Sequence, residues 1–111
     1  MRCQLIGDNE AGYYMHRVDC VLVGAQAILD DGSILNRAGT FQIALLAKHH
    51  SKPFYVFAES YKFLRRNYLS QADIPQRFTE DGSRKMRTIM IDLTPSHLIS
   101  MFCTDNGVYN P

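Results

Sequence analysis

Two short apolar runs constrain the fold of this chain more than any other feature of its sequence. The first occupies residues 19–24 and ends at Gly24, and the second runs from Phe54 to Ala58. Neither run alternates polar with apolar residues, so neither is typical of a strand with one wet face. Such runs indicate strands buried on both faces, which is the situation of strands in a parallel sheet.

The segment between the two runs predicts a helix, which parallel strands need as a crossover. Phe41 to His49 contains good helix formers, with its apolar residues at helical spacing. Thr40 is a suitable N-cap, and Pro53 prevents the helix from continuing. The order strand, helix, strand therefore accounts for the first half of the chain.

The rest of the chain predicts further elements by the same criteria of periodicity, capping and turn residues. The expected elements are a strand over Cys3–Ile6, a helix over Glu10–Arg17, a turn at Asp30–Ser33, a surface loop at Glu80–Ser83, a strand over Thr88–Asp92 and a helix over Ser96–Phe102 with Thr94 as its N-cap.

This alternation of strands and helices predicts an α/β domain with a mainly parallel sheet. Right-handed crossovers would place helices on both faces of that sheet. Ligands of such domains gather outside the carboxyl ends of the strands. The residues that follow the predicted strands are therefore the first place to look for a functional site.

Two segments fall at such positions. Gly24 and Gln26 directly follow a predicted buried strand, and the segment from Asn36 to Thr40 directly precedes the predicted helix. In the second segment Gly39 and Thr40 offer backbone N–H groups and a hydroxyl, and Arg37 adds a fixed positive charge. Together these groups can hold a phosphate. The local pattern is equally that of an ordinary turn, with Thr40 as a cap and Arg37 in solvent, because it is neither a Walker loop nor a dinucleotide-binding loop.

Other candidates are weaker. Glu59, just past a predicted strand, can either meet a ligand hydroxyl or cap a neighbouring segment. His49 and His50 are adjacent on the helix and point in different directions, so they do not suggest a metal site. The three cysteines, Cys3, Cys20 and Cys103, are few and widely spaced, which suggests reduced thiols in a cytoplasmic protein. We expect no metal and no cofactor.

Charge and length exclude several classes of function. The formal net charge is +1 over 111 residues, so there is no general attraction to nucleic acid or to an anionic membrane. No apolar run approaches the ~20 residues that cross a bilayer, and the first residues do not form a secretory signal. The expected partners are other proteins or a small molecule.

At the same segments the sequence resembles a known superfamily, which unites the alpha, beta and delta subunits of initiation factor 2B with two sugar-phosphate isomerases. The motifs that carry the resemblance are Val21-Leu22-Val23-Gly24-Ala25, Asp31-Gly32 and Asn36-Arg37-Ala38-Gly39-Thr40. Further segments are most similar to the alpha-subunit branch. They are Lys52-Pro53-Phe54-Tyr55-Val56, Ala58-Glu59-Ser60-Tyr61-Lys62-Phe63, Leu69-Ser70-Gln71-Ala72-Asp73-Ile74-Pro75 and Thr104-Asp105-Asn106-Gly107-Val108.

The resemblance implies that residues 1–111 form one Rossmann-like C-terminal domain. In the family such a domain follows an N-terminal helical domain, for which this chain has no counterpart, and it continues into a final helix and tail. We therefore expect a fragment or a truncated member of the family.

Departures from the family pattern bear on activity. The isomerases have an aspartate that transfers a proton at the position of Gln26, and an amide cannot act as a general acid or base. Their catalytic cysteine belongs to a segment before Met1. In contrast, Asn36, Gly39 and Thr40 match ligand-binding positions of the family, and Arg37 replaces a lysine. The resemblance thus implies a pocket that binds a sugar phosphate or nucleotide without converting it.

The expected function is that of a regulatory subunit of the guanine-nucleotide exchange factor for initiation factor 2. The resemblance implies that it forms a homodimer, assembles with the other initiation factor 2B subunits and helps the complex sense the phosphorylated alpha subunit of initiation factor 2. The alternative is a sugar-phosphate isomerase acting on methylthioribose-1-phosphate or ribose-1,5-bisphosphate. A beta or delta subunit is a further alternative within the first class.

Overall fold

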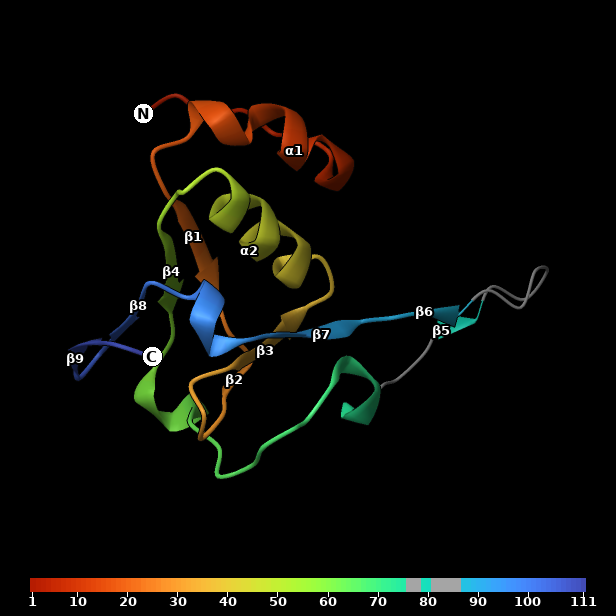
Figure 1. The fold of residues 1–111 in the computed structure, drawn as a ribbon, viewed down its shortest axis with the longest axis vertical. Coiled ribbons are helices and arrows are strands. Elements are labelled where there is room, and N and C mark those ends of the chain that lie inside the picture. Colours follow the sequence, from red (N-terminus) through yellow and green to blue (C-terminus); the bar gives the residue numbers. More distant parts are fainter. Residues whose placement is uncertain (76–78, 81–86) are drawn as a thin grey trace.

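The computed structural model describes residues 1–75, 79–80 and 87–111, and their strands form three sheets (Figure 1). The helical segments, with η for a 3₁₀ helix, are η1 (Asp8–Glu10), α1 (Ala11–Tyr14), η2 (Met15–Arg17), α2 (Thr40–His49), η3 (Ser60–Lys62), η4 (Gln71–Asp73) and η5 (Ser96–Leu98). The strands are β1 (Val21–Gly24), β2 (Ala27–Ile28), β3 (Ile34–Arg37), β4 (Phe54–Phe57), β5 (Thr79–Glu80), β6 (Arg87–Thr88), β7 (Ile91–Thr94), β8 (Met101–Thr104) and β9 (Gly107–Tyr109).

The main sheet has the strand order β1-β4-β8-β9, and we refer to it as sheet A. β1, β4 and β8 are parallel, and β9 returns antiparallel to β8 at the edge. This arrangement confirms the predicted α/β class with a mainly parallel sheet. It also confirms that the two apolar runs, residues 19–24 and Phe54–Ala58, contain neighbouring parallel strands, β1 and β4.

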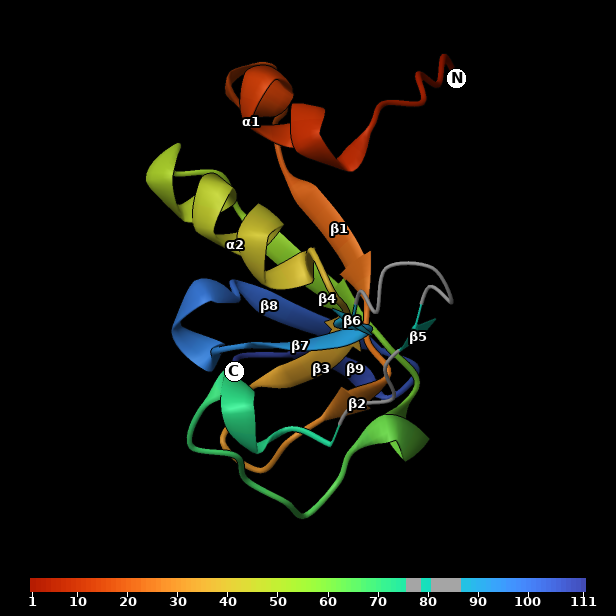
Figure 2. The same ribbon diagram turned by 90° about the vertical axis from the view of Figure 1, so that its right-hand side faces the viewer.

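One face of sheet A carries the core of the domain. Helix α2 lies alongside β1 and β4 (Figure 2), and its Ala44 and Ala47 are buried against the sheet together with Phe54 and Val56. Two small residues on the inner side of α2 let the helix approach the strands closely. Leu98 and Ile99, from the crossover between β4 and β8, join the same cluster.

A helix on the second face of sheet A was expected, and the described residues do not supply one. Leu22, Phe57 and Met101 point to that face and are 60%, 48% and 38% exposed. The crossovers from β1 to β4 and from β4 to β8 move in the same direction across the sheet. Crossovers of one hand that move in one direction lie on one face, so both fall on the side of α2.

A second sheet, sheet B, is antiparallel with the order β2-β3-β7. The turn at Asp30–Ser33, which joins β2 to β3, is as predicted. Leu29, Ile74 and Leu93 form a separate small cluster beside this sheet. The outer edge of β7 is partly covered by a side chain, because the Gln71 amide donates to the Leu93 carbonyl (2.7 Å) and accepts from the Leu93 N–H (2.8 Å).

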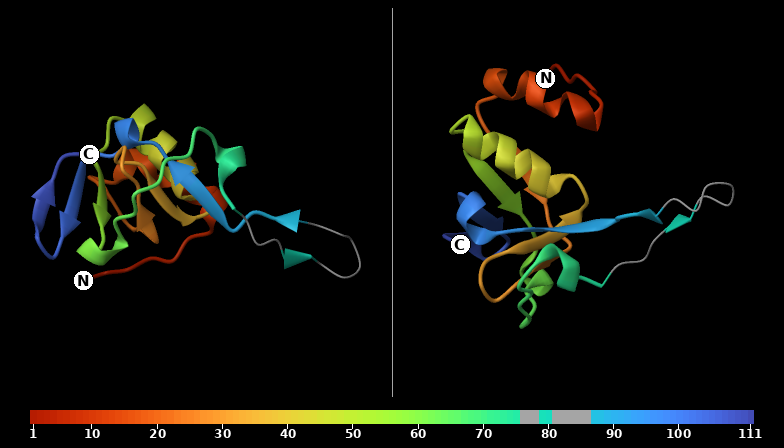
Figure 3. Two further views of the ribbon diagram at one scale, coloured as in Figure 1. Left: turned by 90° about the horizontal axis from the view of Figure 1, so that it is seen from below. Right: turned by 45° about the vertical axis from the view of Figure 1, so that its right-hand side comes forward.

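β5 and β6 form a small antiparallel pair that lies at the opposite end of the molecule from β8 and β9 (Figure 3). The predicted loop at Glu80–Ser83 lies, apart from Glu80, outside the described residues. The predicted strand Thr88–Asp92 is divided: Thr88 belongs to β6, Ile91 and Asp92 belong to β7, and residues 89 and 90 separate them.

Two predicted elements are wrong. Cys3–Ile6 is not a strand but an irregular segment in which Leu5 is fully exposed, and none of the described strands pairs with it. The predicted helix Ser96–Phe102 is a single 3₁₀ turn, Ser96–Leu98, followed by β8. Thr94 ends β7 and caps nothing. The segment is a strand because Phe102 is buried under α2 while Met101 faces the other side, which is strand periodicity.

Candidate functional site

The candidate site is the turn that joins β3 to α2. Gly39 has a φ of +108°, a conformation that favours glycine, and a Cβ built on Gly39 would have no atom within 4 Å. The Ala38 N–H donates to the carbonyl oxygen of Met90 at 2.9 Å, which fastens the turn to the segment before β7. Backbone geometry and one long-range hydrogen bond thus define where α2 begins.

Thr40 does not cap the helix as predicted, because it is the first residue of α2 and the N-cap position belongs to Gly39. Its hydroxyl instead points back along the chain. Thr40 Oγ1 donates to the carbonyl oxygen of Arg37 at 2.8 Å and accepts from Nδ2 of Asn36 at 3.2 Å. The side chain of Thr40 is therefore a bridge that orients Asn36 and the backbone of Arg37.

The acceptor at the N-terminus of α2 is Asp92, a residue with no site role predicted from the sequence. Asp92 Oδ2 accepts from the Gly39 N–H at 2.8 Å and from the Phe41 N–H at 3.1 Å. The residue is opposite Asn36 in the β3–β7 ladder, which places it beside the turn. A signal existed in the sequence: Asp92 is an ionisable residue inside an apolar stretch, and such residues usually have a partner when they are buried.

The environment of Asp92 is only partly favourable to its charge. Burial raises the pKa of the Asp92 carboxyl above its ordinary value of 3.8, while hydrogen bonds from the backbone of Phe41, Gly39 and Asp92 itself lower it. Asp92 Oδ1 is buried and accepts no hydrogen bond from the described residues. A cavity of about 560 Å³ adjoins the residue, with Ala38, Gln71 and Ile91 among its lining side chains.

Four of the six predicted site residues, Asn36, Arg37, Gly39 and Thr40, meet in this turn. Arg37 ends β3 with an exposed side chain. Gln26 lies next to the same strand, because its N–H donates to the Leu35 carbonyl oxygen at 2.8 Å, and its side chain is exposed.

Gly24, the remaining predicted residue, ends β1. A Cβ there would lie 3.9 Å from the carbonyl oxygen of Phe57. Gly24 is the register partner of Phe57 in the neighbouring strand β4, and no described hydrogen bond links it to the turn.

Carboxylates also gather at the carboxyl ends of β4 and β8. Asp105 accepts from the N–H of Ser60 at 2.7 Å and from its hydroxyl at 3.2 Å, and Glu59 is paired with Lys62 at 3.1 Å. The Ser60 N–H holds the pKa of Asp105 below its ordinary value. The backbone N–H of Glu59, and then Lys62, do the same for the pKa of Glu59. Glu59 occupies the N-cap position of η3, but its side chain makes no capping hydrogen bond. It forms an exposed ion pair with Lys62 instead, and such a pair contributes little to stability.

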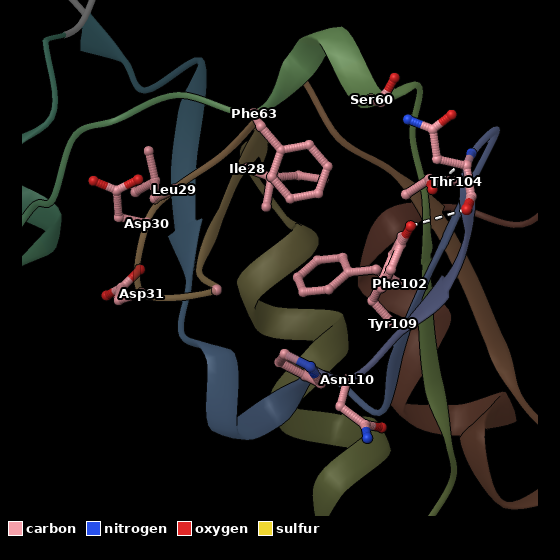
Figure 4. Close-up of a pocket in the computed structure, with 13 residues that line it drawn as sticks. Ile28, Leu29, Asp30, Asp31, Ser60, Phe63, Phe102, Thr104, Tyr109 and Asn110 are labelled. Carbon is pink, nitrogen blue, oxygen red and sulfur yellow. Dashed lines mark hydrogen bonds between the residues drawn. The ribbon is translucent and has the colours of Figure 1, made fainter.

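A cavity of about 670 Å³ lies apart from the turn and is lined by none of the six predicted residues. Figure 4 shows its apolar lining, with Ile28, Phe63 and Phe102 from three different segments, and with the carboxylates of Asp30 and Asp31 directed away from these rings. The described residues hold no group of three or more side chains suited to a metal ion. Among them, no helix has the length and apolarity that a membrane crossing requires.

Comparison with known proteins places the chain in a family. The family model described as the initiation factor 2 subunit family matches residues 1–111. The translation initiation factor eIF2B subunit alpha of Caenorhabditis elegans is 36% identical over 113 residues, which is 96% of this chain and 37% of that protein. The ribose 1,5-bisphosphate isomerase of Archaeoglobus fulgidus is 35% identical over 117 residues, again 96% of this chain and 37% of that protein.

A solved structure shows the same similarity in three dimensions. The translation initiation factor eIF-2B of Pyrococcus horikoshii OT3 superposes with a TM-score of 0.86 at 31% identity, over 97% of this chain and 39% of that one. The chain therefore spans well under half the length of these relatives. Their number includes both a translation factor subunit and an enzyme.

Proposed function

Because the chain belongs to the initiation factor 2 subunit family, we propose that it acts as a regulatory, non-catalytic subunit of the guanine-nucleotide exchange factor for translation initiation factor 2. Its contribution is assembly with other subunits of that factor in the cytoplasm. Its site at the end of β3 binds a sugar phosphate or a nucleotide without turnover. No cofactor takes part.

Gln26 is the observation that carries the non-catalytic part of the proposal. A proton must be moved between two carbons in an aldose–ketose isomerisation, which requires a group that can gain and lose a proton near neutral pH. The amide of Gln26 cannot do this. Its exposed side chain lies beside β3, the strand that ends in Asn36 and Arg37, which is where the family resemblance locates an aspartate in the isomerases.

The binding part of the proposal rests on Asn36 and Arg37. The Asn36 amide is held by Thr40 Oγ1 at 3.2 Å, and Arg37 presents a guanidinium in solvent with no ion pair among the described residues. A planar guanidinium recognises a phosphate through paired hydrogen bonds. An oriented amide and a free guanidinium on one strand end thus favour a phosphorylated ligand with hydroxyl groups.

An isomerase is the second candidate, favoured by the 35% identity to the ribose 1,5-bisphosphate isomerase of Archaeoglobus fulgidus. It requires a proton-transfer group other than Gln26. Asp92 is not a suitable replacement, because its Oδ2 is engaged by two backbone N–H groups and its Oδ1 is buried.

The deciding experiment is calorimetric titration of the protein with ribose 1,5-bisphosphate, 5-methylthioribose 1-phosphate and nucleoside monophosphates, with product analysis on the same samples. The proposal expects saturable binding of at least one phosphorylated compound and no product. Conversion of either sugar phosphate to its ketose isomer would establish the enzyme instead. Arg37→Gln is the matched variant, because it removes an exposed charge at little cost in stability and should abolish the binding.

Assembly is tested separately. The proposal includes a homodimer and association with other eIF2B subunits and with the alpha subunit of initiation factor 2. Sedimentation of the protein alone reports the dimer, and co-purification with tagged eIF2B subunits reports the complex. A monomer that recovers no subunit would contradict the regulatory role.

A further inference from the structure

A carboxylate of the protein itself already occupies the N-terminus of α2. Helix termini attract anions because their first N–H groups have no partner within the helix. Here the Gly39 and Phe41 N–H groups both donate to Asp92 Oδ2, at 2.8 and 3.1 Å. Asp92 reaches them from β7, more than fifty residues later in the chain, so the contact is tertiary and not part of a local turn.

This contact changes how a phosphate can be bound nearby. Two of the backbone donors at the start of the helix are engaged, and a second anion at the same place would meet the charge of Asp92. The guanidinium of Arg37 and the amide of Asn36 carry no such obstacle. A phosphorylated ligand is therefore directed to the end of β3 and away from the end of the helix.

Asp92 also supports the side chain of Asn36 and the backbone of Arg37. It holds Gly39, whose φ of +108° sets the direction of the turn, and it holds Phe41 on the other side of Thr40. Thr40 Oγ1 is thereby fixed where it meets both the Arg37 carbonyl and the Asn36 amide. Four hydrogen bonds thus connect Asp92, through the backbone around Thr40, to the Asn36 side chain and to the backbone carbonyl from which the Arg37 side chain extends.

We propose that Asp92 is an internal substitute for an anion at the N-terminus of α2 and the positioning residue for Asn36 and Arg37. In this role it keeps the helix end closed to phosphate and orients the side chains that bind a phosphorylated ligand. The second half of this statement rests on the proposed ligand-binding function, and the first half does not.

The test is a titration of ¹⁵N-labelled protein with inorganic phosphate. The signals monitored are the amide resonances of Gly39 and Phe41. In the wild type these two amides should show only the drift that potassium chloride also causes. In Asp92→Ala they should move saturably with phosphate, because the vacated place accepts the anion. Asp92→Asn, whose side-chain oxygen can still accept both N–H groups, should behave like the wild type.

Each result has a definite meaning. Saturable phosphate shifts of Gly39 and Phe41 in the wild type would overturn the inference, and so would their absence in a folded Asp92→Ala variant. If Asp92→Ala does not fold, the wild type and Asp92→Asn still decide, because shifts in either protein contradict a closed helix end.

A second titration, with ribose 5-phosphate, tests the positioning role. In metal sites the loss of a residue that supports a ligand side chain weakens binding by roughly 10–100-fold. A weakening of that order is expected here, so Asp92→Ala should bind less tightly and Asp92→Asn should restore affinity. Equal affinity in all three proteins would refute the positioning role. If none of them binds a sugar phosphate, the proposed ligand-binding function fails, whereas the phosphate titration still reports on the helix end.

Discussion

The two faces of sheet A are built from the same strands and differ in almost every other respect. On the α2 face, Phe54 and Val56 are 1% and 0% exposed and belong to the main core. On the opposite face, Phe57 of the same strand and Leu22 of the neighbouring strand β1 are about half exposed or more. Composition does not separate the faces, because both are apolar.

The difference teaches that patterning alone does not determine burial in this chain. Parallel strands are apolar on both sides because helices normally cover both sides. Here the crossovers that lie within the described residues cover one side only. An apolar strand residue of sheet A therefore stabilises the core if it lies on the α2 face and is solvent-exposed if it lies on the other face. Substitutions on the two faces should differ in their effect on the free energy of unfolding.

The largest contrast should come from two phenylalanines of β4. Phe54→Ala leaves a cavity beneath α2 and should cost about 3–5 kcal/mol of unfolding free energy, which is a large part of the stability of a domain of this size. Phe57→Ala is the matched control on the exposed face and should cost less than about 1 kcal/mol. Urea unfolding followed by circular dichroism measures both. Equal costs would mean that the second face is covered in solution.

A smaller effect is expected from the cap of the helix that covers the buried face. Asp92→Ala leaves the Gly39 and Phe41 N–H groups without their acceptor and should cost about 2 kcal/mol. Asp105→Ala, which removes the exposed carboxylate that accepts from Ser60, is the control and should change the unfolding midpoint far less. If Asp92→Ala changes the unfolding free energy as little as the control is expected to, the cap of α2 does not contribute to the coverage of sheet A.

The pH dependence of stability should also depend on Asp92, and the direction of the pKa shift of Asp92 determines its sign. Burial raises the pKa of Asp92 in the folded protein above its value of 3.8 in a free chain. An acid of this kind binds protons more readily when folded, so it lowers stability above its folded pKa and this loss is relieved as the pH falls through that pKa. The stability of the wild type relative to Asp92→Asn should thus rise on acidification toward pH 4. A relative decrease over that interval would mean that the hydrogen bonds outweigh burial.

The smallest effect is expected on the exposed face itself. Leu22→Lys exchanges an exposed apolar side chain for a charge in the middle of that face, and the unfolding free energy should change by no more than about 0.5 kcal/mol. Val23→Lys, the next residue in β1, points to α2 and should prevent folding at room temperature. The pair compares the two faces within two residues of one strand, by the same urea measurement.

Helices and strands whose own residues carry the pattern that determines them were predictable from the sequence. β1, β4 and α2 follow from apolar runs and helix-forming residues, and the family resemblance follows from short motifs around them. Ser96–Phe102 was not predictable in this way, because Thr94 and Pro95 give the local pattern of a helix start. The parallel pairing of β8 with β4, a tertiary interaction, decides that Phe102 lies in a strand.

The candidate site divides in the same manner. Asn36, Arg37, Gly39 and Thr40 were identified because they are adjacent in the chain. Asp92 was missed, and the role of Thr40 was misassigned, because the acceptor that caps α2 arrives from β7. A local capping residue and a distant one satisfy the same N–H groups, and only the fold reveals which is present.

The contact between Gln71 and β7 also has a consequence for how the molecule behaves among its own copies. A primary amide offers one donor and one acceptor side by side, as a peptide group does, so Gln71 acts as a one-residue substitute for a neighbouring strand. The outer edge of β7 is thereby withheld at Leu93 from pairing with a strand of another molecule. At Leu93 a single neutral side chain thus blocks strand pairing at a sheet edge, where proteins often place lysine or proline.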